Sequence, residues 1–485
     1  MLGVYVHTHW GYNHPYAART WTRADWEGYL EGLRGLGYDF LMIWPLLDSM
    51  PPNPNASDRA FLQLVAQAIE AAQRRFGMRV AVITCPNTIG NERAERYAYA
   101  ERPYFSCEKK VNPADKAAVE AFLAGRRRQL EPLAGADVLA VIDSDPGGYI
   151  GSTNDEFVAL LKGQIDVFRE FNPSAELMYW MLFGWENYNR FWAAAQAWQP
   201  GDPHPWIDLD SGVYTETLTM IREQVAEPWS LTAGIPEHLT AVTALGLENK
   251  TLAFPYGLVE GEPTFPLTEW DPARLERGLS SPVAQQARRG AMANAQTHCL
   301  QLPHLYLFSH LAQGGTVESA DLAGFARRLL PGLEELIAEA WQGLTKAEPS
   351  IQRDLAQQVR AQAGGSHPMG ELKGMLFGDP NRFLNDLAMN LEMRAALTEF
   401  AQAAPVDAQA IRKLLKVVRP YQQQLGFVDA YGGAVYEKMN RPLEQVADPA
   451  IHAALEQFVD WRDPGVRQGV TLRLLDAMEA FAEKD

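Results

Sequence analysis

Short apolar segments alternate with longer amphipathic segments along roughly the first two-thirds of the chain. A short apolar run is typical of a buried strand, and an apolar residue at every third or fourth position is typical of a helix that packs by one face. Strands that alternate with helices predict βα units and a parallel sheet. The strands that we expect cover residues 2–7, 39–45, 79–84, 137–143, 176–183, 229–234, 251–256 and 289–296.

Helices are expected between these strands, and the first has a clear start signal. Thr22 and Asp25 stand three residues apart before an amphipathic run, which is the spacing of a capping box. The next three helices are expected over residues 56–77, 114–133 and 154–171. A glycine at the end of the second and an Asn-Pro pair after the fourth are typical helix ends.

Two architectures accommodate this alternation of strands and helices. A doubly wound open sheet predicts a glycine-rich phosphate turn after the first strand, but the sequence there is Thr8-His9-Trp10-Gly11-Tyr12. We therefore expect an α/β fold of the (β/α)8 TIM barrel type. The strand pattern ends near residue 316, and every later segment has helical periodicity. The predicted domains are a barrel over residues 1–345 and an α-helical C-terminal extension over residues 346–485.

Composition and charge narrow the classes of partner. The 485 residues are 47% hydrophobic and 21% charged, and the formal net charge is -17. Nucleic acids and anionic membranes are normally bound by a basic face, so we expect neither as a partner. No apolar run is long enough to span a membrane, and the three cysteines lack the spacing of a zinc site. We see no signal peptide, so we expect a cytoplasmic protein, although a chain whose signal had been removed would look the same.

The strongest candidate for chemistry follows the fourth expected strand, where an apolar run leads directly into Asp143, Ser144 and Asp145. Alternate residues of a strand point to the same side, so both carboxylates are expected to face the barrel mouth, where barrel enzymes carry their active sites. Two close carboxyl groups raise one another's pKa, so one can act as a general acid while the other stays ionised. The alternative is an Asp-rich turn without catalytic role.

Other strand ends carry further candidates. The seventh strand is followed by Glu260 and Glu262, either of which could bind sugar hydroxyls or act as a nucleophile. His7 and His9 form a His-x-His pattern after the first strand, which also occurs in metal-dependent amidohydrolases. The fifth strand lacks a histidine and the eighth lacks an aspartate, so we expect no metal site and no cofactor.

Aromatic and amide side chains at the strand ends are typical of a sugar pocket, because flat rings stack on the C–H faces of sugars. Filling of a large core is the alternative role for any single tryptophan. The substrate-binding residues that we expect are His9, Trp10, Trp44, Asn87, Trp180, Trp185, Tyr256, Glu260, Glu262, Asn294 and Gln296.

The aspartate pair and its aromatic surroundings resemble the substrate-assisted β-N-acetylhexosaminidases, broadly glycoside hydrolase families 20, 84 and 123 and the chitinase-like family 18. The resemblance covers about the first 340 residues. It implies that Asp143 orients the 2-acetamido group of the substrate and that Asp145 is the general acid/base. Ser144 separates the two aspartates, which resembles the spacing of family 18 but not its full motif.

Three functions follow as hypotheses. The first is a retaining exo-glycosidase, a β-N-acetylhexosaminidase with N-acetylgalactosamine as a candidate sugar, acting on an amino-sugar glycoside by substrate-assisted catalysis. The second is a glycosidase with Asp145 as acid and Glu260 or Glu262 as nucleophile or base. The third is a non-catalytic carbohydrate-binding barrel. The C-terminal helices are a candidate surface for a homo-oligomer.

Overall fold

The structure is a computed structural model, and contacts within it divide the chain into two units. The first comprises Met1–His9, Gly37–Tyr256 and Arg277–Asn294, and the second comprises Trp10–Leu36, Gly257–Glu276 and Ala295–Asp485. The residues that the structure describes are 1–8, 11–103, 107–199, 202–203, 205–259, 268, 270–295, 298–346, 348–426, 439, 441–459 and 470–484.

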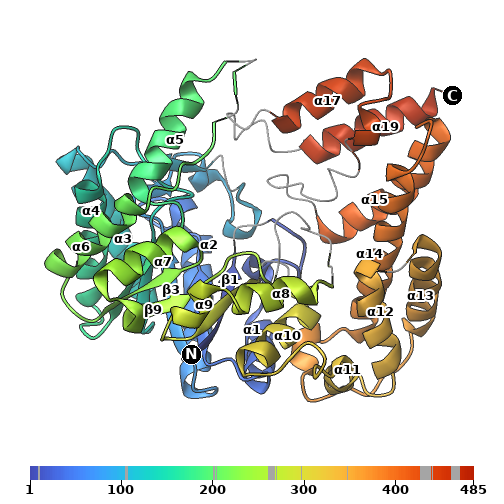
Figure 1. The fold of residues 1–485 in the computed structure, drawn as a ribbon, viewed down its shortest axis with the longest axis horizontal. Coiled ribbons are helices and arrows are strands. Elements are labelled where there is room, and N and C mark those ends of the chain that lie inside the picture. The colour runs from blue at the N-terminus through green and yellow to red at the C-terminus, as the bar shows by residue number, and fades with distance from the viewer. Residues whose placement is uncertain are drawn as a thin grey trace. The chain divides into compact units, whose positions relative to one another are not determined.

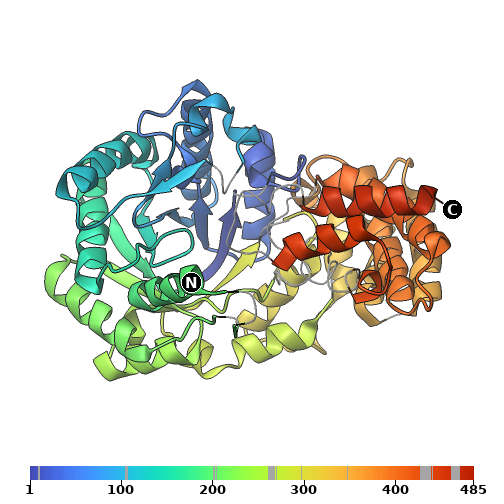
Figure 2. The same ribbon diagram turned by 90° about the horizontal axis from the view of Figure 1, so that it is seen from above.

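Eight parallel strands close into a barrel in the order β1-β10-β9-β8-β7-β6-β3-β2, which confirms the predicted fold class. In Figure 2 these strands lie at the centre of the barrel with helices around them. Each strand falls inside a segment expected from the apolar runs, and the last strands are shorter than expected. Their bounds are β1 Leu2–His7, β2 Phe40–Trp44, β3 Arg79–Thr84, β6 Val138–Ile142, β7 Glu176–Trp180, β8 Trp229–Ala233, β9 Thr251–Ala253 and β10 Ala291–Ala295.

Alternate side chains of these strands point into the barrel and fill it. Met42, Ile83, Ile142, Met178 and Met292 belong to one buried cluster, which draws on different strands of the barrel. Inward and outward positions alternate with the period of two that a pleated strand imposes. The barrel interior is therefore a packed core, and any substrate site must lie above it, at the strand ends.

Helices connect the strands, and the first unit has one insertion among them. The helices of this unit are α2 Ala56–Arg74, α3 Lys116–Leu130, α4 Asn154–Arg169, α5 Trp185–Ala197, α6 Ser211–Gln224, α7 Pro236–Leu245 and α9 Pro282–Gln286 (Figure 1). Helix α8 (Pro272–Leu279) is divided between the two units. The insertion lies between β3 and α3, where the short strands β4 (Thr88–Gly90) and β5 (Glu108–Lys110) form an antiparallel hairpin. No signal in the sequence had predicted this hairpin.

The second unit is helical. Its helices are α1 Arg23–Gly35, α10 Leu302–Ala312, α11 Leu322–Leu329, α12 Glu334–Lys346, α13 Pro349–Gln362, α14 Pro380–Ala401, α15 Ala408–Leu425, α17 Pro449–Val459 and α19 Val470–Glu483. The expected capping box is present, since the Thr22 side chain accepts from the Asp25 amide and Asp25 accepts from the Thr22 amide. Across the helices of the described ranges, none combines the length and the apolar character needed to cross a membrane.

Helix α1 packs closely against a segment that lies far along the chain. The 3-10 helix η8 (Lys373–Leu376) contacts α1. A Cβ atom added at Gly374 would lie 2.3 Å from the Gly28 carbonyl oxygen, and one at Gly32 would lie 2.1 Å from the Met375 side chain. Backbones can approach this closely only where the side chain is a hydrogen atom. The domain boundary that we predicted at residue 345 stays a prediction. By its contacts, α1 belongs to the same unit as the segments after that residue.

The amino-terminal ends of the strands are tied together by one buried carboxylate. Glu176, at the start of β7, accepts from Arg79 of β3 at 2.7 Å and from Arg289, just before β10, at 2.5 Å. Ser230 of β8 also donates to it. The hydrogen bonds of Arg289 and Ser230 outweigh the effect of burial and lower the pKa of Glu176 to about 2. One anion thus links strands from separate parts of the barrel.

We predict that Glu176→Ala destabilises the protein by about 3 kcal/mol, because it leaves two arginines without their anion. The stabilisation by Glu176 is fully present above the usual glutamate pKa and is lost as the pH falls toward 2. Urea unfolding at several pH values measures both effects. Glu170→Gln, which breaks the exposed pair with Arg127, is the control and should cost less than about 1 kcal/mol. Equal losses in the two variants would contradict this role of Glu176.

Candidate active site

Asp143 lies at the end of β6 and is fully buried. Its carboxylate accepts from the Tyr179 hydroxyl at 2.9 Å, from the Ser144 hydroxyl at 2.7 Å and from the backbone amides of Leu182 and Phe183 at 3.1 Å each. Burial raises its pKa, and these hydrogen bonds oppose the rise. Four donors occupy both oxygens, so Asp143 fixes the turn after β7.

The placement of Asp143 differs from the expectation that it faces the barrel mouth. Ile142 points into the barrel, so the next side chain points outward, toward the helices. Its partner Tyr179 packs against Phe157 of α4, with ring centroids 5.7 Å apart. Because Asp143 is enclosed by the protein, we correct the expected pairing: Asp143 and Asp145 do not project together into a pocket.

Asp145 lies beyond the strand, where the chain turns. Its φ of 27° is in the left-handed region, which is uncommon for a residue other than glycine and is often found at functional sites. The side chain is partly exposed. The turn is held from two sides, since Thr88 donates to the Pro146 carbonyl at 3.2 Å and the Tyr149 amide donates to Asn189 of α5 at 2.8 Å. Asp145 is therefore the member of the pair that reaches solvent.

The hairpin β4–β5 is joined to the Asp145 turn by Asn87. This side chain is fully buried and donates to the Val111 carbonyl at 2.8 Å and to the Gly148 carbonyl at 3.1 Å. The Val111 amide in turn donates to the Asn87 carbonyl at 2.8 Å. We had expected Asn87 to bind substrate, whereas the structure uses its amide group to connect two loops.

A buried ion pair supports the base of the hairpin. Arg126 of α3 and Asp48 are both wholly buried, with Nη2 and Oδ1 3.0 Å apart. Arg126 also donates to the Thr88 carbonyl at 2.6 Å, and Asp48 accepts from the Cys85 amide at 3.1 Å and the Trp44 indole at 2.8 Å. The chain that leaves β3 is thus fixed on its way to the hairpin.

Glu108 on β5 is the second carboxyl group of the site. The side chain is half-buried, and its Oε2 atom is shielded from solvent and has no hydrogen-bond partner among the described residues. Burial raises the pKa of Glu108 well above its usual value, and the charges of Asp48 and Asp145 raise it further, while Lys110 opposes them. Glu108 therefore releases its proton less readily than an ordinary glutamate, and the charge of Asp145 contributes to this.

Lys110 stands two residues along the same strand. Its ammonium nitrogen lies 5.7 Å from the ring centroid of Tyr188 and 5.4 Å from that of Trp192, both on α5. Burial lowers its pKa, and the nearby Glu108 and Asp145 counteract that effect. One short strand thus brings an acid and a cation to the same place as Asp145.

Strand order explains why these groups meet. Strands β2, β3, β6 and β7 are consecutive neighbours in the barrel, and the hairpin, the Asp145 turn and α5 follow three of them. Trp44 and Trp180 end β2 and β7. Their rings lie 5.9 Å apart, and Tyr256 lies 6.4 Å from Trp180. These three expected residues come together as an aromatic group at the carboxyl ends of the strands. Trp44 and Trp180 are buried in the barrel core, and Tyr256 is partly exposed.

The remaining expected residues divide into two classes. Trp185 is fully buried, stacks on Phe157 and donates to Ser152 at 3.0 Å, so it belongs to the helix layer and does not line a pocket. Asn294 on β10 is also fully buried. The other candidates lie outside the described residues: His9, Trp10, Glu260, Glu262 and Gln296.

Sequence reasoning missed Glu108 and Lys110. The available signal was weak: charged residues 108–110 stand between Cys107 and Val111, both of which are buried. Strands of three residues give too short a pattern to recognise. Within the described part of the chain, no group of three or more histidine, cysteine or acidic residues is arranged to hold a metal ion.

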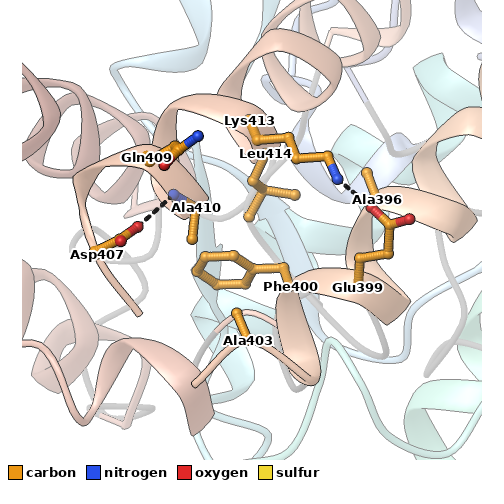
Figure 3. A pocket seen from close by; sticks show the side chains of 9 residues that line it. All are labelled: Ala396, Glu399, Phe400, Ala403, Asp407, Gln409, Ala410, Lys413 and Leu414. Atoms are coloured by element: carbon orange, nitrogen blue, oxygen red, sulfur yellow. Dashed lines mark hydrogen bonds and ion pairs between the residues drawn. The ribbon is translucent and has the colours of Figure 1, made fainter. Parts of the chain in front are cut away.

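A separate cavity of about 280 Å³ lies between α14 and α15 (Figure 3). Phe400 and Leu414 form part of its wall. Lys413 donates to Glu399 at 2.8 Å, and Asp407 accepts from the first turn of α15. Each charged residue on the wall already has a partner, so this cavity adds no chemistry to the site.

Comparisons with known proteins give fold-level similarity only. No protein-family model and no curated protein matches the chain. Among solved structures, a GH5_18 enzyme from Streptomyces cattleya in complex with Manb1-4GlcNAc has 14% identity, covers 82% of this chain and 91% of its own, and gives a TM-score of 0.31. The GH20 modules of the pneumococcal exo-beta-D-N-acetylglucosaminidase StrH have 10% identity, cover 81% of this chain and 97% of their own, and give a TM-score of 0.34. N-acetylneuraminate lyase from Aliivibrio salmonicida has 9% identity, covers 87% of this chain and 96% of its own, and gives a TM-score of 0.33. Scores this low carry no argument about function.

We predict that Asp143 and Tyr179 act as one structural unit. Asp143→Asn should cost about 2 kcal/mol of unfolding free energy and Tyr179→Phe about 1 kcal/mol, because each leaves a buried group without its partner. The double variant should cost less than the sum by about 1 kcal/mol. Urea unfolding of the three variants measures this coupling, and additive losses would show that the hydrogen bond contributes little.

Proposed function

We propose that this protein is a glycoside hydrolase in which Glu108 is the general acid and Asp145 is the ionised carboxylate. One observation carries the proposal: Glu108 and Asp145 come from the segments that follow the neighbouring strands β3 and β6, and burial together with the charges of Asp48 and Asp145 raises the pKa of Glu108. Hydrolysis of a glycosidic bond needs this division between a proton donor and an anion.

The reaction assigns a task to each group. Glu108 donates its proton to the glycosidic oxygen as the bond from that oxygen to the anomeric carbon breaks. The Asp145 carboxylate stabilises the positive charge that develops on the sugar ring. Water then completes the reaction: its oxygen bonds to the anomeric carbon, and one of its protons restores the Glu108 acid. Tyr256, the partly exposed member of the aromatic group, supplies aromatic surface for the sugar.

The finer proposal is a retaining, exo-acting β-N-acetylhexosaminidase that works by substrate assistance, with N-acetylgalactosamine and N-acetylglucosamine as the sugars to compare. Asp143 is enclosed, so Asp145 takes over the task of orienting the 2-acetamido group. The acetamido oxygen then attacks the anomeric carbon while Glu108 protonates the leaving oxygen. The alternative is that a carboxylate of the protein, such as Glu260 or Glu262, is the nucleophile. In that case the enzyme would be fully active on sugars that lack the acetamido group.

We predict that Glu108→Gln and Asp145→Asn each reduce kcat/KM by about 10³-fold or more, because each removes one half of the acid and carboxylate pair. A panel of 4-nitrophenyl glycosides that includes both N-acetylhexosaminides identifies the substrate, and the variants are then compared on it. Glu92→Gln is the matched control, since Glu92 lies in the same hairpin loop, is 86% exposed and pairs with Lys109. It should retain activity.

Two outcomes of that experiment would contradict the proposal. The first is a wild-type protein that hydrolyses none of the glycosides. The second is a Glu108→Gln variant as active as Glu92→Gln. Unfolding curves for both variants are needed beside the kinetics, because Oε2 of Glu108 is shielded and a loss of fold would imitate a loss of catalysis.

The pH dependence provides an independent prediction. A general acid must be protonated, so activity should fall as the pH rises through the pKa of Glu108, which lies above the usual glutamate range. The Lys110 charge holds this pKa down. We therefore expect Lys110→Met to move the alkaline limb of kcat/KM to higher pH. A limb that stays in place, or moves to lower pH, would exclude Glu108 as the titrating acid.

A further inference from the structure

The ammonium group of Lys110 is held in place by rings rather than by an anion. The Tyr188 ring near Lys110 also stacks on Phe183, with centroids 5.8 Å apart and planes 8° apart. Trp192 meets Tyr188 edge to face at 5.9 Å. Cation–π contacts attract an ammonium group but accept no hydrogen bond in the ordinary sense. The described residues provide no ion-pair or hydrogen-bond partner for the Lys110 nitrogen.

Another lysine of the chain shows what a purely structural version of this contact looks like. The Lys250 nitrogen lies 4.4 Å from the Trp229 ring centroid. It also donates to both oxygens of Glu227, at 2.6 and 2.8 Å, and to the Trp229 carbonyl at 3.1 Å. Lys250 is thus held by a ring and satisfied by acceptors, whereas Lys110 is exposed, lies near two rings and has no acceptor among the described residues for its three N–H donors.

The neighbour of Lys110 provides a second comparison. Lys109 points away from this place and pairs with Glu92 at 3.8 Å at an exposed position. Adjacent residues of a strand face opposite sides, so Lys110 lies on the same side of β5 as Glu108, although both lysines are exposed. The charges of Glu108 and Asp145 both favour the charged form of Lys110.

We propose that Lys110 is a specificity residue that binds an anionic group, a carboxylate or a sulfate, on the sugar next to the bond that is cleaved. This inference rests on the proposed function for the identity of that bond, and it adds that the substrate is an acidic saccharide. The net charge of -17 does not oppose it, because charges farther away than about 8 Å are largely screened at physiological salt and the local cation decides.

The test is a binding measurement in a variant that lacks the general acid. Isothermal titration calorimetry on Glu108→Gln compares glucuronate with glucose, and N-acetylglucosamine 6-sulfate with N-acetylglucosamine. We expect the anionic member of at least one pair to bind about tenfold more tightly, as one charge-assisted hydrogen bond provides. The pair that shows the preference identifies carboxylate or sulfate as the group recognised.

The same titrations are repeated with Lys110→Met and with Lys109→Met as the matched control, each added to Glu108→Gln. The preference should disappear in the Lys110 variant, persist in the Lys109 variant and weaken as sodium chloride is added. Equal binding of anionic and neutral sugars, or equal effects of the two lysine substitutions, would overturn the proposal. If Glu108→Gln still hydrolysed glycosides, the proposed acid would be wrong, while the preference for anions would still test Lys110.

Discussion

The arrangement of the site depends on the buried ion pair between Arg126 and Asp48. A buried guanidinium is tolerated only when its donors are satisfied, and Arg126 is satisfied by Asp48, by side-chain amides and by the carbonyls of Cys85 and Thr88. Those carbonyls belong to the segment that enters the hairpin. The ion pair therefore fixes where the hairpin begins, and the Asp48 charge also raises the pKa of Glu108 on the same hairpin.

Three acidic residues near β6 illustrate how surroundings rather than residue type assign a task. Asp143 is buried among four donors and holds a turn. Asp145 follows two residues later in an uncommon backbone conformation and is partly exposed. Glu108 lies on β5, and its Oε2 atom is shielded from solvent and has no hydrogen-bond partner in the described part of the chain. Similar carboxyl groups thus occupy three different environments, and the proposed reaction uses two of them.

The barrel could be predicted from the sequence because its strands are apolar on both faces and stand out as runs between amphipathic helices. Because the strands are apolar on both faces, the sequence did not show to which side of the barrel wall Asp143 points. All five residues of Val138–Ile142 are apolar and buried, so the sequence could not show which of them point inward, and the side chain that follows was placed on the wrong face.

The other differences have equally local causes. Glu108 and Lys110 come from strands of three residues, too short to leave a pattern, and their neighbours in space lie on α5, about 80 positions along the chain. Trp185 follows a strand end as expected, but it begins a helix and packs on Phe157. Strand-end position therefore predicted that Trp44, Trp180 and Tyr256 lie together, but it did not predict the burial of Trp44 and Trp180.

The close approach of Gly28 and Gly374 has a consequence for how the chain acquires its structure at the ribosome. Helix α1 emerges early, yet the backbone against which it packs is synthesised more than three hundred residues later. At typical rates of about 5–20 residues per second, α1 must wait on the order of tens of seconds for that contact. During this interval the apolar face of α1 lacks its final partner, so this part of the structure can form only after most of the chain has been synthesised.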